Sequence, residues 1–399
     1  MSGPKENVEQ LLSETGGILR VEPAWVGRDW LPPGRRLGMD DGAYDLGDRG
    51  FICERWLAST PHADNKTGPD DEGLSYVHVD GERRMLLGEA VAADPVGFLG
   101  ADYAQGHRGL GRLAKIFDFG ARIPYHIHPR LEHARLVGRN PKEEAYYFPT
   151  GVDMGKHPET FFGVHPWIAE QGKGDVLLPY LVDWDSDLVL RHARAELQVP
   201  GDGFHLPAGI LHAPGTALTI ELQEESDTAS FFQALNAGKI ISKELLFKDI
   251  HPQRRQQLGE RAALDWVDWP ANGDPYFYEH HHLAPTVVEG SLQPGGYEEW
   301  LFGNTTKFSG KRLVVRPGQA YQSVDKGVFS LLAWSGRGSF DTVELQSGEP
   351  GMDELVVCHD KATRPLAVTC TGSEELVLFK FFGPDINLDV PRIPTRPTV

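Results

Sequence analysis

The sequence predicts a mainly β protein made of two β domains with a helical connector between them. Its 399 residues are enough for two average domains. The 45 glycines and 29 prolines supply many turns, which favours numerous short strands over long helices. Runs of strand length also recur in two separate parts of the chain. We expect the domains at residues 1–235 and 291–399, with the connector at residues 236–290.

The first β region lies between about Gly50 and Phe232, where short runs alternate with glycine, proline and aspartate. The runs include FICERWLA, GRLAKIFDFG, PYHIHP, EAYYFPTG and ALTIELQEES. Each is long enough for one strand and is followed by residues that favour a turn. This spacing suits a closed or sandwiched antiparallel domain.

The connector has a different pattern. AGKIISKELLFKDIHPQRRQQLGERAALDWVDW places apolar residues at helical spacing, so we expect one or two helices that are interrupted near Pro252. The run His280–His282 follows, and we expect it in a loop because adjacent strand residues alternate faces and could not all bind one metal. Sequence typical of strands follows in KRLVVRPGQAY, VFSLLAWSGRGSF and LAVTCTGSEELVLFKFFGPD, and it predicts the second β domain.

The composition narrows the class of function. A net charge of −18 argues against binding of nucleic acid, which requires clustered basic residues. Cys53, Cys358 and Cys370 are far apart and have no metal-type spacing. The sequence has neither a signal-peptide pattern nor a run of roughly 20 apolar residues for a membrane helix. We therefore expect a cytoplasmic protein that acts on a small molecule, has no membrane or nucleic-acid partner, and is a candidate homodimer.

Two histidines one residue apart form the first candidate metal-binding element. On a strand, His126 and His128 point to the same face and offer a metal two imidazole nitrogens. Three glutamates follow as candidates for a further ligand. Spacing alone favours Glu132, four residues after His128, and leaves Glu143 and Glu144 open.

A second element lies in GDGFHLPAGILHAPG, where a tight turn leads to His212. The next strand alternates cleanly, with Thr219, Glu221 and Gln223 on one face and leucine or isoleucine on the other. A polar face that leads away from a histidine is unusual for a core strand, so it predicts a wet, functional interior.

Together these elements resemble the two motifs of the cupin superfamily. The first motif is matched by Gly120, His126, His128, Glu144 and Gly151, and the second by Gly201, Pro207, Gly209 and His212. The resemblance implies two jelly-roll β barrels. It also implies a metal site in the N-terminal barrel, formed by His126, His128, Glu144 and His212, and no recognisable ligands in the C-terminal barrel.

Among cupins, the text from about residue 50 to residue 235 is similar to type I phosphomannose isomerases. HIHPRLE, NPKEE, LPAGILHA and ELQEESD resemble the family's QVHPDKE, NHKPE, LPAGTPHA and ECMASSD. The Asn-x-Lys-x-Glu match selects Glu144 over the other glutamates and singles out Lys142. Two positions depart from the family, because His126 stands where it has a glutamine and Phe231 where it has a catalytic arginine.

Three imidazoles and one carboxylate suit a divalent metal, with zinc as our first choice and iron, manganese or nickel as alternatives. The resemblance implies a metal-dependent isomerase that interconverts an aldose and a ketose, acting on a sugar or a sugar phosphate. Such a reaction needs charge stabilisation at the oxygens and a group that moves a proton between neighbouring carbons.

We expect Lys142 and Glu221 to carry protons in this reaction, and we expect burial and the metal to lower the pKa of Lys142. Tyr146 and His205 are our candidates for substrate binding. The alternative for Lys142 and Glu221 is a purely structural ion pair at the mouth of the barrel.

Two other functions are open at this point. An iron or manganese cupin dioxygenase uses the same set of ligands and would have a small apolar pocket at the metal. A non-catalytic sugar-binding cupin would turn Lys142 and Glu221 away from the metal. Since Phe231 replaces an arginine, the phosphorylation state of the sugar is also open.

Overall fold

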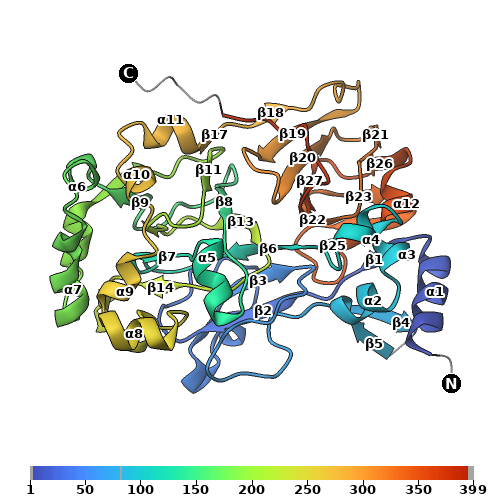
Figure 1. The fold of residues 1–399 in the computed structure, drawn as a ribbon. Coiled ribbons are helices and arrows are strands. Elements are labelled where there is room, and N and C mark those ends of the chain that lie inside the picture. The colour runs from blue at the N-terminus through green and yellow to red at the C-terminus, as the bar shows by residue number, and fades with distance from the viewer. Residues whose placement is uncertain (1–2, 81–82, 394–399) are drawn as a thin grey trace.

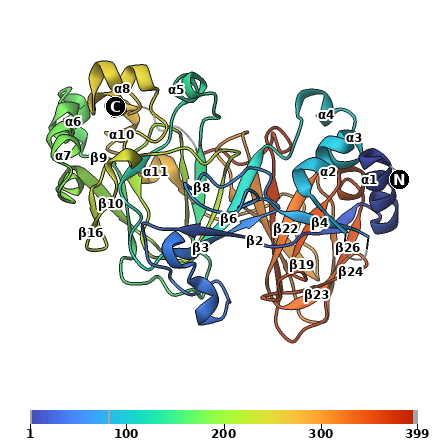
Figure 2. The same cartoon turned by 90° about the horizontal axis from the view of Figure 1, so that it is seen from below.

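The computed structural model describes residues 3–80 and 83–393 and is mainly β, as predicted. Its strands form antiparallel sheets that lie in two halves side by side (Figure 1). Helices are short and gather at the two ends of the molecule, with α6 to α8 at one end and α1 to α4 at the other (Figure 2). None of the described helices is long and apolar enough to span a bilayer.

The first half contains a seven-stranded and a five-stranded sheet. The seven strands, in order across the sheet, are β17 (His282–Leu283), β11 (Gly203–Leu206), β8 (Glu144–Tyr147), β13 (Thr219–Glu224), β6 (Arg112–Phe117), β3 (Phe51–Leu57) and β2 (Ala24–Arg28). The five strands are β10 (Ala193–Leu197), β9 (Glu159–Val164), β12 (His212–Ala213), β7 (His126–Ile127) and β14 (Ser230–Phe231). The strand runs quoted above, from FICERWLA to ALTIELQEES, therefore all contain strands.

An aromatic core joins these two sheets. The ring of Phe162 in β9 lies 5.0 Å from that of Phe204 in β11, across the two sheets. Phe117 and Tyr146 of the seven-stranded sheet, whose rings are 5.8 Å apart, belong to the same core. The opposite face of the seven-stranded sheet is also covered, because Tyr147 packs against Phe379 of the second half. The central strands β6, β8 and β13 are buried on both faces, so a charged side chain on them needs a partner inside the protein.

The second half also contains two sheets. The seven-stranded sheet has the order β1 (Ile18–Arg20), β25 (Glu354–Val357), β22 (Phe329–Ser335), β27 (Leu376–Phe382), β20 (Ser309–Val315), β19 (Gly296–Phe302) and β18 (Thr286–Val287). The four-stranded sheet has the order β21 (Ala320–Ser323), β26 (Leu366–Cys370), β23 (Arg337–Phe340) and β24 (Val343–Gln346). Both contribute to one apolar core. The sheet orders of the described residues contain no closed barrel.

The start of the chain belongs to this second half by its contacts. Strand β1 pairs with β25, so that Ile18 lies opposite Val357. Val8 of α1 and Leu87 of α2 also lie in the core of the second half. A three-residue strand has few contacts of its own, and it adds to the edge that β25 leaves free.

The connector is more broken than the sequence predicted. The hairpin β15 (Leu235–Asn236) to β16 (Lys239–Ile240) replaces the expected start of a helix, and its turn uses positive φ angles at Ala237 and Gly238. Pro252 begins helix α8 and does not interrupt a longer one, because proline fits the first turn of a helix.

The remaining elements are short. The helices are α1 (Pro4–Thr15), α2 (Leu87–Ala93), α3 (Pro95–Leu99), α4 (Tyr103–Gly106), α5 (Leu131–Ala134), α6 (Pro166–Glu170), α7 (Leu178–Asp183), α8 (Pro252–Leu258), α9 (Arg261–Leu264), α10 (Trp269–Asn272), α11 (Phe277–His281) and α12 (His359–Ala362). Single 3₁₀ turns cover Asp41–Tyr44, Gly47–Arg49, Arg135–Val137, Gly174–Leu177, Leu188–His192 and Lys243–Leu245. A two-stranded sheet pairs β4 (Tyr76–Asp80) with β5 (Arg83–Leu86).

Candidate metal centre

Three histidines from two neighbouring strands meet inside the first half. Strands β7 and β12 pair so that His126 lies opposite His212, and His128 follows directly after β7. One ring nitrogen from each histidine lies within 4.8 Å of the others, and all three residues are buried. This spacing is compatible with three ligands around one ion.

Backbone carbonyls fix the orientation of the three rings. His126 Nδ1 lies 2.7 Å from the oxygen of Pro124, and His128 Nδ1 lies 2.7 Å from the oxygen of Thr228. His212 Nδ1 lies 3.0 Å from a backbone oxygen in the same way. Each carbonyl can only accept, so each Nδ1 donates a proton and each Nε2 keeps a lone pair. Imidazoles that ligate metals are held in this manner.

Glu144 in β8 completes the cluster. Its carboxylate oxygens lie 3.0 Å from His128 Nε2 and 2.9 Å from His212 Nε2. The ring nitrogens and the carboxylate are all acceptors when the imidazoles are neutral, so they repel one another unless a cation lies between them. His212 Nε2 is moreover buried without a hydrogen-bond partner. These four side chains therefore fit a divalent metal ion.

The other two glutamates lie elsewhere. Glu132 is exposed on α5 and pairs with Arg130. Glu143 points to the opposite face of β8, where its carboxylate lies 2.9 Å from His205 Nε2 and 2.9 Å from Lys307 Nζ. The strand phase thus separates Glu144 from its neighbour, as expected for alternating side chains.

The electrostatics keep the cluster ready for a cation. Burial lowers the pKa of His126 well below its usual value, and burial together with Lys142 lowers the pKa of His128 to about 3. Burial opposes ionisation of Glu144, but Lys142 and the flanking histidines outweigh it and hold the pKa of this carboxyl well below its usual range. Neutral imidazoles and an ionised carboxylate are the forms that bind metal.

Lys142 and Glu221 face this cluster. Lys142 Nζ lies 2.9 Å from Glu144 Oε2, 3.1 Å from His128 Nε2 and 3.3 Å from Glu221 Oε1. The expected downward shift of the Lys142 pKa is wrong for the chain alone. Burial does lower it, but Glu144 and Glu221 outweigh burial and raise the pKa of the ammonium above its usual value. Burial raises the pKa of Glu221 to about 7.

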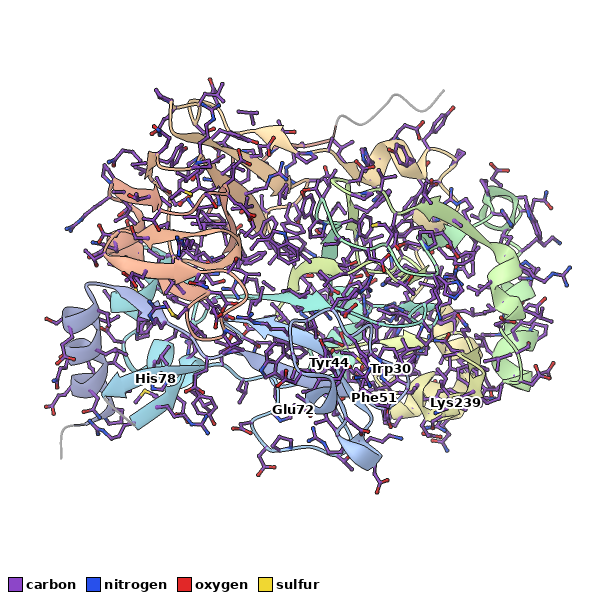
Figure 3. All side chains as sticks on the ribbon, turned by 180° about the vertical axis from the view of Figure 1, so that it is seen from behind. Trp30, Tyr44, Phe51, Glu72, His78 and Lys239 are labelled. Carbon is purple, nitrogen blue, oxygen red and sulfur yellow. The ribbon has the colours of Figure 1, made fainter. Side chains whose placement is uncertain are left out.

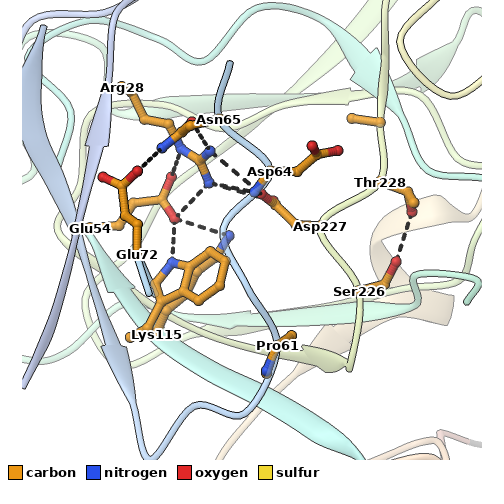
Figure 4. Close-up of polar contacts among 12 residues, drawn as sticks. Arg28, Glu54, Pro61, Asp64, Asn65, Glu72, Lys115, Ser226, Asp227 and Thr228 are labelled. Atoms are coloured by element: carbon orange, nitrogen blue, oxygen red, sulfur yellow. Dashed lines mark hydrogen bonds and ion pairs between the residues drawn. The ribbon is translucent and has the colours of Figure 1, made fainter. Parts of the chain in front are cut away.

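A network of buried ion pairs extends from Glu221, and the sequence did not predict it. Lys115 in β6 lies 3.3 Å from Glu221 and 3.5 Å from Glu54 in β3. Arg28 in β2 lies 2.7 Å from Glu54 and 3.4 Å from Asp227, so four segments contribute to one network (Figure 4). The available signal was a charged residue inside an apolar strand run, as in LAKIF and FICERW.

His126, His128 and Glu144 line a pocket with a volume of about 700 Å³, together with the charged network. Aromatic rings beside the cluster line it as well. Phe231 stacks on the ring of His126 at 5.4 Å, Trp30 meets Phe231 edge-on at 5.6 Å, and Trp30 stacks on Phe119 at 5.4 Å. We call Trp30, Phe119 and Phe231 the aromatic wall. Trp30 and Lys239 of the pocket lining are labelled in the rear view (Figure 3).

The two candidates for substrate binding are placed differently. Tyr146 lines the pocket, and its hydroxyl donates a hydrogen bond to Glu144. His205 is not part of the pocket lining, because it lies on the opposite face of β11, between Glu143 and Asn304. The structure thus places His205 outside the described pocket, and its role in substrate binding stays a prediction.

We expected a loop at His280–His282, but this run ends helix α11 and begins strand β17. His280 pairs with Asp274, His281 Nδ1 bonds to the backbone oxygen of His205, and His282 pairs with Asp202. None of the three lines the described pocket.

No family model matches the sequence. Among solved structures, the mannose 6-phosphate isomerase of Bacillus subtilis superposes with a TM-score of 0.64 at 16% identity, over 92% of this chain and 99% of that one. A variant of phosphomannose isomerase from Salmonella typhimurium gives 0.62 at 12% identity, over 92% and 100%. This chain has the phosphomannose isomerase fold.

The motifs that resemble the family lie within residues 50–235, whereas the structural similarity covers 92% of the chain. In sequence, the chain is similar to the probable mannose-6-phosphate isomerase GmuF of Bacillus subtilis (strain 168), with 24% identity over 251 residues, or 60% of this chain and 74% of that protein. It is 30% identical to the mannose-6-phosphate isomerase ManA of the same strain over 119 residues. That match spans 29% of this chain and 34% of ManA, about one third of its length.

Proposed function

We propose that this protein is a metal-dependent sugar isomerase that interconverts an aldose and a ketose, like the mannose-6-phosphate isomerases it resembles. One observation carries the proposal. The Nε2 atoms of three buried histidines converge with Glu144, and the Lys142–Glu221 pair adjoins them in one pocket. A Lewis acid beside a proton carrier is what isomerisation requires.

The metal would be held by His126, His128, Glu144 and His212. We propose zinc, with iron, manganese and nickel as alternatives, because all of these accept imidazole and carboxylate ligands. When bound, the ion polarises the oxygen atoms of the sugar and stabilises the negative charge that develops on them.

Two side chains of this protein would move the protons. Glu221 Oε1 is buried and lies 3.3 Å from both Lys115 Nζ and Lys142 Nζ, so these cations orient it to take a proton from one carbon of the sugar and return it to the neighbouring carbon. Lys142 Nζ has three acceptors within 3.3 Å and is thus an ammonium donor. In this position it orients Glu221 and passes a proton between the two sugar oxygens. Tyr146 would help to hold Glu144 in place.

The pocket favours this proposal over its rivals. A dioxygenase was expected to have a small apolar pocket, whereas this one measures about 700 Å³ and is lined by charged groups on one side. A non-catalytic sugar-binding protein was expected to turn Lys142 and Glu221 away from the histidines, whereas both face them.

We further propose that each half is a cupin jelly roll and that residues 1–235, 236–290 and 291–399 are the units of the chain, with β1 contributed to the last one. A homodimer and a cytoplasmic location are also proposals. Size-exclusion chromatography with light scattering tests the first of these two.

The test of function combines elemental analysis with a proton-exchange assay. The purified protein is incubated with free and phosphorylated aldoses in deuterated water, and deuterium at the carbon next to the carbonyl is measured by NMR. We expect about one metal ion per chain, as a four-ligand site requires, together with deuterium incorporation. Metal without incorporation in any sugar would remove the main support for an isomerase.

A further inference from the structure

The cations inside the pocket are already paired. Arg28 lies 2.7 Å from Glu54, and Lys142 lies 2.9 Å from Glu144. Lys115 lies 3.3 Å from Glu221. A phosphate dianion that entered this region would have to separate these pairs or stay buried beside carboxylates, and both are costly in a dry site.

Most of the other cations that line the pocket are also paired with carboxylates. The remaining paired cations of the lining are Arg49 with Glu72 at 2.6 Å, Lys248 with Asp64 at 3.2 Å and Arg255 with Glu244 at 2.8 Å. Among the described lining residues, Lys66 and Lys239 are the cations without an ion pair, and both are exposed at the rim. Exposed lysines bind an anion weakly because water and salt screen them.

The wall beside the metal ligands is aromatic. Phe231 covers the ring of His126, and Trp30 and Phe119 continue the wall. The face of an aromatic ring carries partial negative charge, which disfavours an anion but suits the C–H groups of a sugar. Hydroxyl groups of a neutral sugar can meanwhile bond to the paired charges of the network without separating them.

We propose that the substrate is an unphosphorylated aldose, with its C–H face on the aromatic wall and its hydroxyls toward the charged network. Trp30 is then a specificity-determining residue that contacts the sugar. This inference rests on the proposed function, whose chemistry it narrows to neutral sugars.

Calorimetric binding and deuterium exchange of the metal-loaded protein test this choice with mannose, lyxose and mannose 6-phosphate. We expect kcat/KM for a neutral sugar to exceed that for mannose 6-phosphate by about tenfold or more, the range that one pocket contact gives. Binding and exchange confined to mannose 6-phosphate would overturn the inference and leave the isomerase intact. Binding of neutral sugar without exchange would overturn the isomerase and leave the substrate class intact.

Two variants locate the contact. Trp30→Ala should raise KM for the neutral sugar about tenfold with little change in kcat, because the ring binds the substrate without taking part in proton transfer. Trp30→Phe, the matched control, keeps a ring and should stay close to the original KM. The double variant Lys66→Ala/Lys239→Ala should leave turnover of the neutral sugar unchanged. A loss of turnover specific to mannose 6-phosphate in this variant, together with a wild-type preference for that sugar, would assign the rim lysines to phosphate and refute the proposal.

Discussion

Lys142 Nζ lies 3.3 Å from Glu221 Oε1, and the same ammonium lies 2.9 Å from Glu144. One cation therefore joins the histidine cluster to a carboxylate that has no place in the ligand set. Strands β8 and β13 are hydrogen-bonded neighbours, with Glu144 opposite Gln223 and Tyr146 opposite Glu221, which brings the two carboxylates to one face. The chemistry proposed for the site depends on this pair.

Replacement of Lys142 should separate proton transfer from metal binding. Lys142→Met removes the ammonium but no ligand, so we expect kcat to fall by about 100-fold to 10,000-fold while the metal content stays the same. Lys307→Met is the control, because Lys307 pairs with Glu143 on the outer face of β8. Full activity of the Lys142→Met protein would show that Lys142 forms only a structural ion pair.

Removal of one imidazole should empty the metal site. His212→Ala leaves three of the four proposed ligands, and we expect the purified protein to lose most of its metal by elemental analysis. His280→Ala is the matched control, since His280 pairs with Asp274 and lies outside the pocket. Equal metal content in the two variants would disprove the assignment of His212 as a ligand.

A buried ion pair joins the two halves and should matter for stability. Arg55 in β3 lies 2.7 Å from Asp353 and 2.8 Å from Glu354 next to and within β25, all of them buried. Arg55→Met leaves two carboxylates without their cation, so we expect the free energy of unfolding in urea to fall by about 3–5 kcal/mol. The exposed pair of Arg84 and Glu22 gives the comparison.

Arg84→Met should lower the free energy of unfolding by less than about 1 kcal/mol, because exposed pairs contribute little. If both arginine variants lose the same small amount, the contact between Arg55 and β25 does not stabilise the junction of the halves.

Glu354 should give the protein a distinct pH dependence. Burial raises the pKa of Glu354 to about 7, since Arg55 is shared with Asp353 and only partly offsets it. The folded protein thus holds this proton more tightly than the unfolded chain, whose value is near 4.5. The stabilising contribution is complete below 4.5 and is lost as the pH rises through 7.

Glu354→Gln stays neutral at every pH, so its free energy of unfolding should rise relative to the original protein between pH 4.5 and pH 7. Urea unfolding at several pH values measures this difference. A constant difference across the window would mean that Glu354 remains ionised in the fold.

Local pattern was enough to predict the strands that carry the site. The alternation in ALTIELQEES correctly gave β13, and the phase of EEAYY put Glu144 and Glu143 on opposite faces. Pattern failed in the connector, where the hairpin of β15 and β16 replaces a predicted helix because its turn uses positive φ angles at Ala237 and Gly238.

The pocket itself could not be assembled from spacing. Arg28 and Trp30 lie at and just after the end of β2, whereas Asp227 comes 199 residues after Arg28, and only the pairing of β2 with β3 and the packing of the two sheets bring them together. His205 lies apart from the pocket for a related reason, because the alternation along β11 turns it toward Asn304 of the second half.

Strand β1 cannot complete its sheet pairing until nearly the whole chain has been synthesised. Arg20 bonds to the backbone of Gly351, 331 residues later in the chain, and β1 has no sheet partner until β25 has been made. During synthesis on the ribosome, β1 therefore emerges long before its partner β25, and the apolar side chains of the early segments stay exposed until β25 has been made. Contacts of such long range also slow folding. We expect a nascent chain that stops before β25 to be a client for chaperones, although every residue of the candidate metal centre is already present in it.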